Sequence, residues 1–98
     1  MDFQPAVYML ASKRHGTIYI GVTSNLVRRI WQHRNHVTAG FTARYCVNRL
    51  VWFELCSSMY DAIQYEKRLK NWKREWKIEL IEERNPAWLD LWGEVSSG

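Results

Sequence analysis

The sequence is poor in residues that interrupt or cross-link a chain. It holds two prolines, two cysteines and five glycines in 98 residues, and it has no long apolar stretch. Its apolar runs fall far short of the ~20 residues that a membrane-spanning helix needs, and no export-type leader opens it. We therefore expect a soluble, cytoplasmic protein that does not bind a membrane. Cys46 and Cys56 lack metal-type spacing, so we expect both to be free thiols.

Aromatic side chains are what the sequence has in quantity. Six Trp, five Tyr and three Phe accompany a charged content of 24%, a composition typical of a globular protein rather than a disordered one. A chain of this length buries one modest core. We therefore expect residues 1–98 to form a single domain.

Positive charge is concentrated in one segment. Lys and Arg total 14 against 10 Asp and Glu, which gives a net charge of +4. Six of these basic residues and one acid, Glu75, fall between Lys67 and Lys77. Such a run fits a polyanion as partner.

The hydrophobic patterns predict an α/β (α+β) fold. Runs rich in β-branched and aromatic residues at 6–10, 17–22 and 49–55 predict three strands, the first two joined as a hairpin. Helical spacing predicts helices over residues 25–36 and 59–72 and a short one near 76–81. Asn85 before Pro86 predicts the cap of a last helix. We read residues 37–47 as a loop with one helical turn at 41–45. The expected architecture is a three-stranded, mainly antiparallel sheet flanked by helices.

Three sets of residues are candidates for chemistry, and each has a structural alternative. Arg29 and His33 lie four apart on one predicted helix face, where they either act together or simply flank the core. Glu66 interrupts an apolar stripe, which indicates a salt bridge to Arg29 or Lys70, or a divalent cation. Tyr8 and Tyr19 interrupt apolar strands with hydroxyl groups that serve either the core or a reaction.

The chain resembles the GIY-YIG nucleases, in particular their small single-domain, uncharacterised members. Ala6-Val7-Tyr8 is similar to the first signature of that family, and Tyr19-Ile20-Gly21 matches the second. Arg29 and His33 follow on the next helix, and Glu66 stands on a later one, as in the family. The likeness covers about residues 6–77.

The resemblance implies a metal-dependent endonuclease that hydrolyses phosphodiester bonds, in DNA rather than RNA, with little sequence specificity of its own. Glu66 would hold one Mg²⁺ or Mn²⁺, and Arg29 would bind the scissile phosphate. One of Tyr8 and Tyr19 would deprotonate the attacking water while the other positions it, and His33 would assist. The expected phosphate contacts of the bound strand are Arg28, Arg34, Lys67, Lys70, Lys73 and Arg74.

Some features depart from the family pattern. Val22 stands where many members carry a lysine. We also expect no second domain to supply sequence choice. These departures favour the alternative of a catalytically weak or inactive nucleic-acid-binding module that acts with a partner. A zinc module built from His33, His36, Cys46 and Cys56 fits no usual spacing. We assign Asn85 to helix capping rather than to the site.

Overall fold

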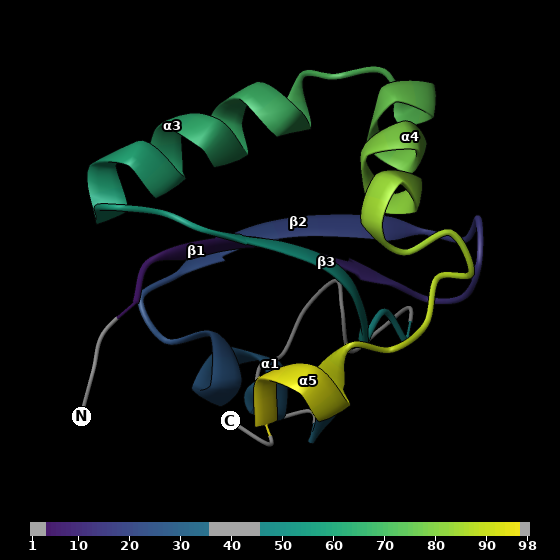
Figure 1. The fold of residues 1–98 in the computed structure, drawn as a ribbon, viewed down its shortest axis with the longest axis horizontal. Helices are drawn as coiled ribbons and strands as arrows, with labels where there is room; N and C mark the ends of the chain where they lie inside the picture. The colour runs from purple at the N-terminus through teal and green to yellow at the C-terminus, as the bar shows by residue number, and fades with distance from the viewer. Residues whose placement is uncertain (1–3, 36–45, 97–98) are drawn as a thin grey trace.

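A computed structural model describes residues 4–35 and 46–96 (Figure 1). The elements follow the expected order of strands and helices. They are β1 (Ala6–Ala11), β2 (Ile18–Thr23), α1 (Leu26–Arg34), β3 (Arg49–Leu55), α3 (Met59–Lys70), α4 (Arg74–Arg84) and α5 (Trp92–Ser96). The turn expected at residues 41–45 lies outside the described residues.

The three strands form one antiparallel sheet in the order β2-β1-β3. β1 is the central strand, and all six of its residues are buried. The expected three-stranded antiparallel sheet is therefore confirmed.

Successive side chains of β1 point to opposite faces of the sheet, as in any strand. Val7, Met9 and Ala11 pack in a core with residues of α3 and α4. Tyr8 and Leu10 pack in a second core with residues of α1. Figure 1 shows the corresponding layers, with α3 and α4 on one side of the sheet and α1 and α5 on the other. Tyr8 thus faces α1.

Side-chain caps begin two of the helices where the sequence predicts them. The Asn25 side chain accepts a hydrogen bond from the backbone N–H of Arg28 at 3.1 Å and caps α1. Ser58 Oγ accepts one from the N–H of Asp61 at 3.1 Å and caps α3. Each cap satisfies a backbone donor that a helix start leaves unpaired.

The expected helix at Asn85-Pro86 is wrong. Asn85 instead ends α4, and the next helix begins at Trp92. The Asn85 side chain is buried and donates to the carbonyl oxygens of Val51 at 3.1 Å and Leu89 at 2.8 Å. It also accepts from the N–H of Leu89 at 2.9 Å. Asn85 therefore ties the α4–α5 connection to β3.

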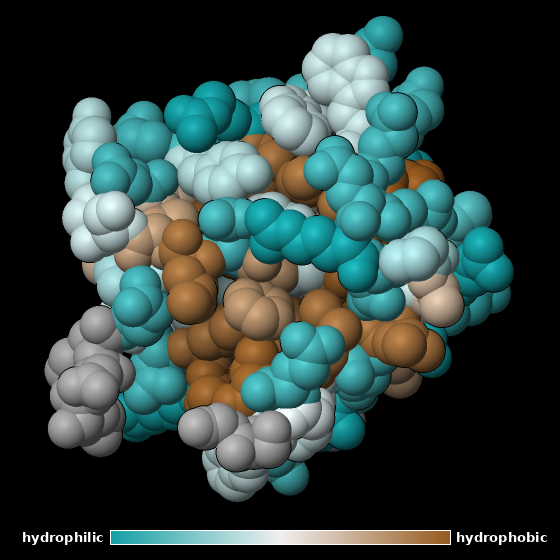
Figure 2. Space-filling view, viewed as in Figure 1, coloured by the Kyte–Doolittle hydropathy of each residue, from teal (hydrophilic) through white to brown (hydrophobic). Residues whose placement is uncertain are grey.

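Apolar side chains also reach the surface on the β3 side of the molecule. Figure 2 shows them gathered on the face in view, bordered by hydrophilic groups. Among the large apolar side chains of the described residues, Leu55 and Leu89 are exposed. Among the described helices, none combines the length and apolarity that crossing a membrane requires.

Candidate active site

Two tyrosines lie on the α1 face of the sheet. In the β1–β2 register Tyr8 pairs with Gly21, and Leu10 pairs with Tyr19. Tyr8 and Tyr19 are thus diagonal neighbours, and the centroids of their rings are 6.4 Å apart. The hairpin register alone brings these two side chains together.

His33 completes a cluster of three rings. Leu26, Ile30 and His33 form the buried face of α1, so packing of this helix directs His33 toward the sheet. The centroid of its imidazole lies 5.9 Å from that of Tyr8 and 5.8 Å from that of Tyr19. The Tyr8 hydroxyl oxygen and His33 Nε2 are 3.1 Å apart in a buried hydrogen bond.

Gly21 leaves the space that Tyr8 fills. A Cβ atom at position 21 would lie 2.4 Å from the Tyr8 hydroxyl oxygen and 2.5 Å from Cζ. Because real Cβ atoms do not approach other atoms this closely, any larger residue would displace the tyrosine. The glycine of the Tyr-Ile-Gly motif therefore has a steric role, which becomes evident only once the strand register is known.

The surroundings of Tyr8 keep its hydroxyl protonated. Burial is the main cause that raises the pKa of Tyr8 to about 12, and interaction with Tyr19 and the Glu66 charge adds to the rise. A hydrogen bond and the positive charge from Arg29 act in the opposite direction. Arg29 is half-buried on α1, one turn before His33, and it is thus the group that would stabilise a tyrosinate here.

The surroundings of His33 keep its imidazole neutral. Burial lowers the pKa of His33 from 6.5, and the neighbouring charge of Arg29 lowers it further. A neutral imidazole has one nitrogen that accepts a hydrogen bond. If that nitrogen is Nε2, the Tyr8 hydroxyl donates to it.

Glu66 approaches the cluster from the other layer. It stands on α3, which packs against β2 and β1, and its side chain is 15% exposed. Its Oε2 forms an ion pair with Lys70 Nζ at 3.0 Å. Of the alternatives expected for Glu66, the salt bridge to Lys70 is therefore present. The Glu66 charge acts on Tyr8 through space. The other four expected residues thus each act on Tyr8, by ring contact, hydrogen bond or charge.

A single carboxylate fits a magnesium-type ion better than a zinc-type one. Mg²⁺ commonly binds one or two carboxylates together with water and substrate phosphate. Glu66 offers one such carboxylate, and its Oε2 already pairs with the Lys70 ammonium group. In residues 4–35 and 46–96 no three His, Cys, Asp or Glu side chains group as a ready-made metal cage. The chemistry of Glu66 therefore fits a Mg²⁺-type ion as a single protein ligand, in competition with the Lys70 ammonium group.

The basic residues expected to contact phosphate divide into two groups. Arg28 and Lys67 are exposed on α1 and α3. The others make contacts within the protein: Lys70 pairs with Glu66, and Lys73 Nζ lies 5.6 Å from the Trp76 ring centroid. Arg74 donates to the carbonyl oxygens of His15 and Gly16, each at 2.7 Å. Arg34 pairs with Asp90. Arg74 thus has a structural role at the β1–β2 turn.

The zinc alternative gains no support among the described residues. His33 bonds Tyr8, and Cys46 and Cys56 are free thiols. His36 lies outside the described residues. Asn85 points to β3 and the α4–α5 connection rather than to the tyrosines.

Comparison with known proteins gives concordant matches. The model of a family described as "GIY-YIG catalytic domain" matches residues 4–79. A UPF0213 protein of Staphylococcus haemolyticus is 35% identical over 82 residues, which cover 80% of this chain and 94% of that protein. A UPF0213 protein of Streptococcus pneumoniae is 31% identical over 98 residues, covering 100% and 98% of the two chains. The solution NMR structure of a UPF0213 protein of Bacillus halodurans is similar with a TM-score of 0.53 and 28% identity, and it covers 84% of this chain and 86% of that one.

Proposed function

This chain belongs to the GIY-YIG family of nuclease domains, and we propose that it is a metal-dependent endonuclease that hydrolyses phosphodiester bonds in DNA. The observation that carries this proposal is the buried Tyr8–His33 hydrogen bond, with Tyr19 and Arg29 beside it. A proton acceptor and a cation placed side by side are what attack by water on a phosphodiester needs.

Tyr8 and His33 would act as one base. His33 Nε2 takes the Tyr8 proton while the Tyr8 oxygen takes a proton from the attacking water. The water oxygen forms a bond to phosphorus, and the bond from phosphorus to the departing oxygen breaks. The raised pKa of Tyr8 opposes this transfer, whereas Arg29 and the neutral state of His33 favour it. Tyr8 is buried and Tyr19 is half-buried, so the water approaches beside Tyr19, which positions it.

Arg29 would bind the scissile phosphate, because its planar guanidinium remains charged and carries several donors. Glu66 would hold the ion. When bound, Mg²⁺ or Mn²⁺ supplies Lewis-acid stabilisation of phosphate and leaving-group oxygens. The exposed Arg28 and Lys67 would contact flanking phosphates without reading bases, which gives little sequence specificity.

The Lys70–Glu66 ion pair favours a second candidate, a binding module with weak or no cleavage that acts with a partner. A carboxylate already neutralised by an internal ammonium group binds a metal ion less readily.

A panel of duplex, branched and single-stranded DNA and RNA, incubated with Mn²⁺ or Mg²⁺, tests the proposal. We expect cutting of DNA by the wild type and loss of cutting in Glu66→Gln and Arg29→Gln. The matched controls Glu83→Gln and Arg68→Gln remove the same charges from exposed positions on α4 and α3 and should cut normally. Binding without cutting by the wild type under all conditions would reject catalysis in favour of the second candidate.

A further inference from the structure

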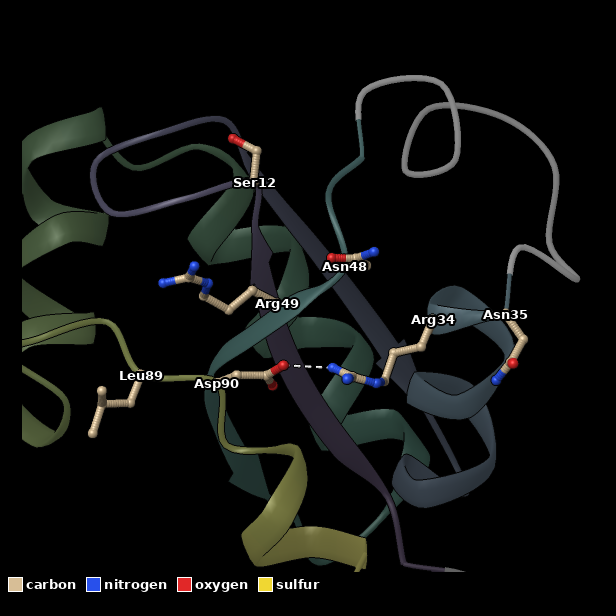
Figure 3. Close-up of a pocket in the computed structure, with 7 residues that line it drawn as sticks. All are labelled: Ser12, Arg34, Asn35, Asn48, Arg49, Leu89 and Asp90. Carbon is tan, nitrogen blue, oxygen red and sulfur yellow. Dashed lines mark hydrogen bonds and ion pairs between the residues drawn. The ribbon is translucent and has the colours of Figure 1, made fainter.

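A polar hollow of about 630 Å³ lies at the end of the sheet (Figure 3). Four segments meet there: the residue after β1, the end of α1, the start of β3 and the chain before α5. The lining side chains are Ser12, Arg34, Asn35, Asn48, Arg49, Leu89 and Asp90. Ligand pockets of about 300–1,000 Å³ are usually apolar with a few polar groups. A hollow with six polar residues in seven instead suits a charged ligand.

Two arginines give the hollow a positive charge. Arg34 and Arg49 contribute two positive charges and Asp90 one negative charge, which leaves +1. The Arg49 guanidinium donates from Nη1 to the carbonyl oxygen of Trp88 at 3.1 Å. Since a guanidinium has five N–H donors, most of those on Arg49 remain for a ligand.

Arg34 is held in place by two contacts. Its Nη1 lies 2.5 Å from Asp90 Oδ2, and its guanidinium carbon lies 5.5 Å from the centroid of the Trp92 ring. Figure 3 shows the side chain reaching from α1 to Asp90. Asp90 is fixed in turn, because its Oδ1 accepts from the N–H groups of Leu50 at 3.3 Å and Trp92 at 3.1 Å. An aromatic face and a carboxylate thus orient Arg34 before any ligand arrives.

Asn48 adds an amide group. Within the described part of the chain its side chain makes no hydrogen bond, so both its donor and its acceptor are available. An amide can hydrogen-bond a sugar hydroxyl or a base edge as well as a phosphate oxygen. The hollow therefore offers more than a site for a bare anion.

The hollow lies within reach of a nucleic-acid strand bound at Tyr8 and Tyr19. Arg34 follows His33 directly in α1. Leu10 pairs with Tyr19 on one side and Leu50 on the other, so Leu50 lies two strand spacings from Tyr19, roughly 10 Å. Arg49 precedes Leu50. A nucleic-acid strand with one phosphate at Arg29 can place a neighbouring nucleotide here.

We propose that this hollow binds one nucleotide of the substrate strand, adjacent to the scissile bond, through its phosphate group. This inference rests on the proposed function and adds a second phosphate site to it. The phosphate replaces Asp90 as the partner of Arg34 and bonds the unused donors of Arg49. The cost of binding is reduced because Trp92 keeps the Arg34 guanidinium oriented throughout.

Titration with deoxyadenosine monophosphate, followed by ¹H–¹⁵N NMR without added metal, tests the site. We expect saturable shifts of the side-chain resonances of Arg34, Arg49 and Asn48, none with deoxyadenosine, and weaker binding of inorganic phosphate. No saturable shift at these residues, or inorganic phosphate binding as tightly as the nucleotide, would overturn the proposal.

Charge variants sharpen the test. Arg34→Gln and Arg49→Gln should each weaken nucleotide binding about tenfold, because each removes hydrogen bonds to a charged group. Arg68→Gln removes an exposed arginine from the other layer and should have no effect. Asp90→Asn should tighten binding several-fold, because it removes the competing charge and keeps the Oδ1 acceptor, whereas Asp61→Asn should not. Equal effects of the pocket variants and their controls would refute the assignment.

A single-stranded oligonucleotide tests whether the hollow serves the substrate strand. The slope of log K against log salt should become shallower by about 0.7 for each phosphate that Arg34→Gln or Arg49→Gln no longer neutralises. An unchanged slope in both variants would refute a role in strand binding. Because no metal and no cleavage are involved, this result is independent of whether the protein cuts DNA.

Discussion

The hydroxyl oxygen of Tyr8 lies 3.1 Å from Nε2 of His33, although 25 positions separate the two residues in the chain. Both side chains are buried, and Arg29 acts on both of them electrostatically. A buried hydroxyl–imidazole pair beside a guanidinium group can transfer a proton without solvent. Its contribution can be separated from that of the fold by single-atom changes.

Tyr8→Phe removes the hydroxyl oxygen and keeps the ring. We expect cleavage to fall at least about 100-fold, because general-base catalysis contributes that much or more. The free energy of unfolding should fall by only about 1 kcal/mol, the usual loss for one hydrogen bond. Cleavage rates and urea unfolding measure the two effects. Tyr60→Phe, at an exposed position on α3, is the control and should change neither.

The pH dependence of the free energy of unfolding should report the protonation of His33. Its pKa is lowered in the folded state, so below about pH 6.5 the unfolded chain binds more protons than the folded one. Stability is therefore full above that pH, falls as the pH drops below it, and levels off only below the folded-state pKa. Urea unfolding between about pH 7.5 and 5 measures the decline. We expect His33→Gln to flatten this decline in stability, and a full decline in His33→Gln would contradict the assignment to His33.

The pH dependence of the cleavage rate should also depend on the protonation of His33. The proposed base needs neutral His33, so the acid limb of the pH–rate profile should lie below pH 6.5, the ordinary pKa of histidine. In His33→Gln we expect a lower rate and no such limb. An acid limb that persists unchanged in this variant would assign it to another group.

Gly21→Ala adds one carbon atom against Tyr8. The new Cβ would lie 2.4 Å from the hydroxyl oxygen, so the ring must move and the bond to His33 must lengthen. We expect cleavage to fall strongly in a protein that still folds. Gly93→Ala is the control, since nothing lies within 4 Å of a Cβ there. Normal cutting by Gly21→Ala would show that the position of Tyr8 is not critical.

Lys70→Gln frees the Glu66 carboxylate from its internal cation. We expect Mn²⁺ to bind several-fold more tightly, because the 3.0 Å ion pair no longer competes with it. Titration calorimetry measures this affinity directly. Lys67→Gln, which removes an exposed lysine from the same helix, should leave it unchanged, and Glu66→Gln should abolish it. Mn²⁺ affinity that is insensitive to both Glu66 and Lys70 would place the ion elsewhere.

Asn85→Ala should destabilise the fold without a direct effect on the candidate active site. The variant loses three side-chain hydrogen bonds at a buried position, which corresponds to about 2–4 kcal/mol. Asn71→Ala, at the exposed end of α3, loses one and should cost less than about 1 kcal/mol. Urea unfolding measures both. A small loss in Asn85→Ala would mean that the connection to β3 is held by other contacts.

Much of this fold follows from local sequence patterns. The strand at Arg49–Leu55 and the start of α3 after Ser58 coincide with their predictions, because alternation and capping are properties of a few neighbouring residues. Local patterns left the roles of Tyr8, Tyr19, Arg29 and His33 open, and the resemblance to the GIY-YIG nucleases is what named them as a set. The structure places them on one hairpin and the next helix.

Features that depend on distant residues could not be predicted in this way. Asn85 before Pro86 has a local capping pattern. Its side chain instead donates to the carbonyl oxygens of Val51 and Leu89, and these bonds determine its position. Arg34 has the appearance of a solvent-exposed basic residue until Asp90, 56 positions away, is placed beside it. The space that Gly21 leaves for Tyr8 requires the strand register. In each case the deciding partner comes from another element.

The sheet order also bears on how the protein is made. β1 comes before β2 and β3 in the chain, yet it lies between them. During synthesis β2 can pair with it as soon as the hairpin leaves the ribosome, whereas its other edge must wait for β3. An unpaired edge of apolar residues is a template for pairing with other chains. Chains whose synthesis stops before Arg49 should therefore aggregate, and chains that reach Leu55 should not.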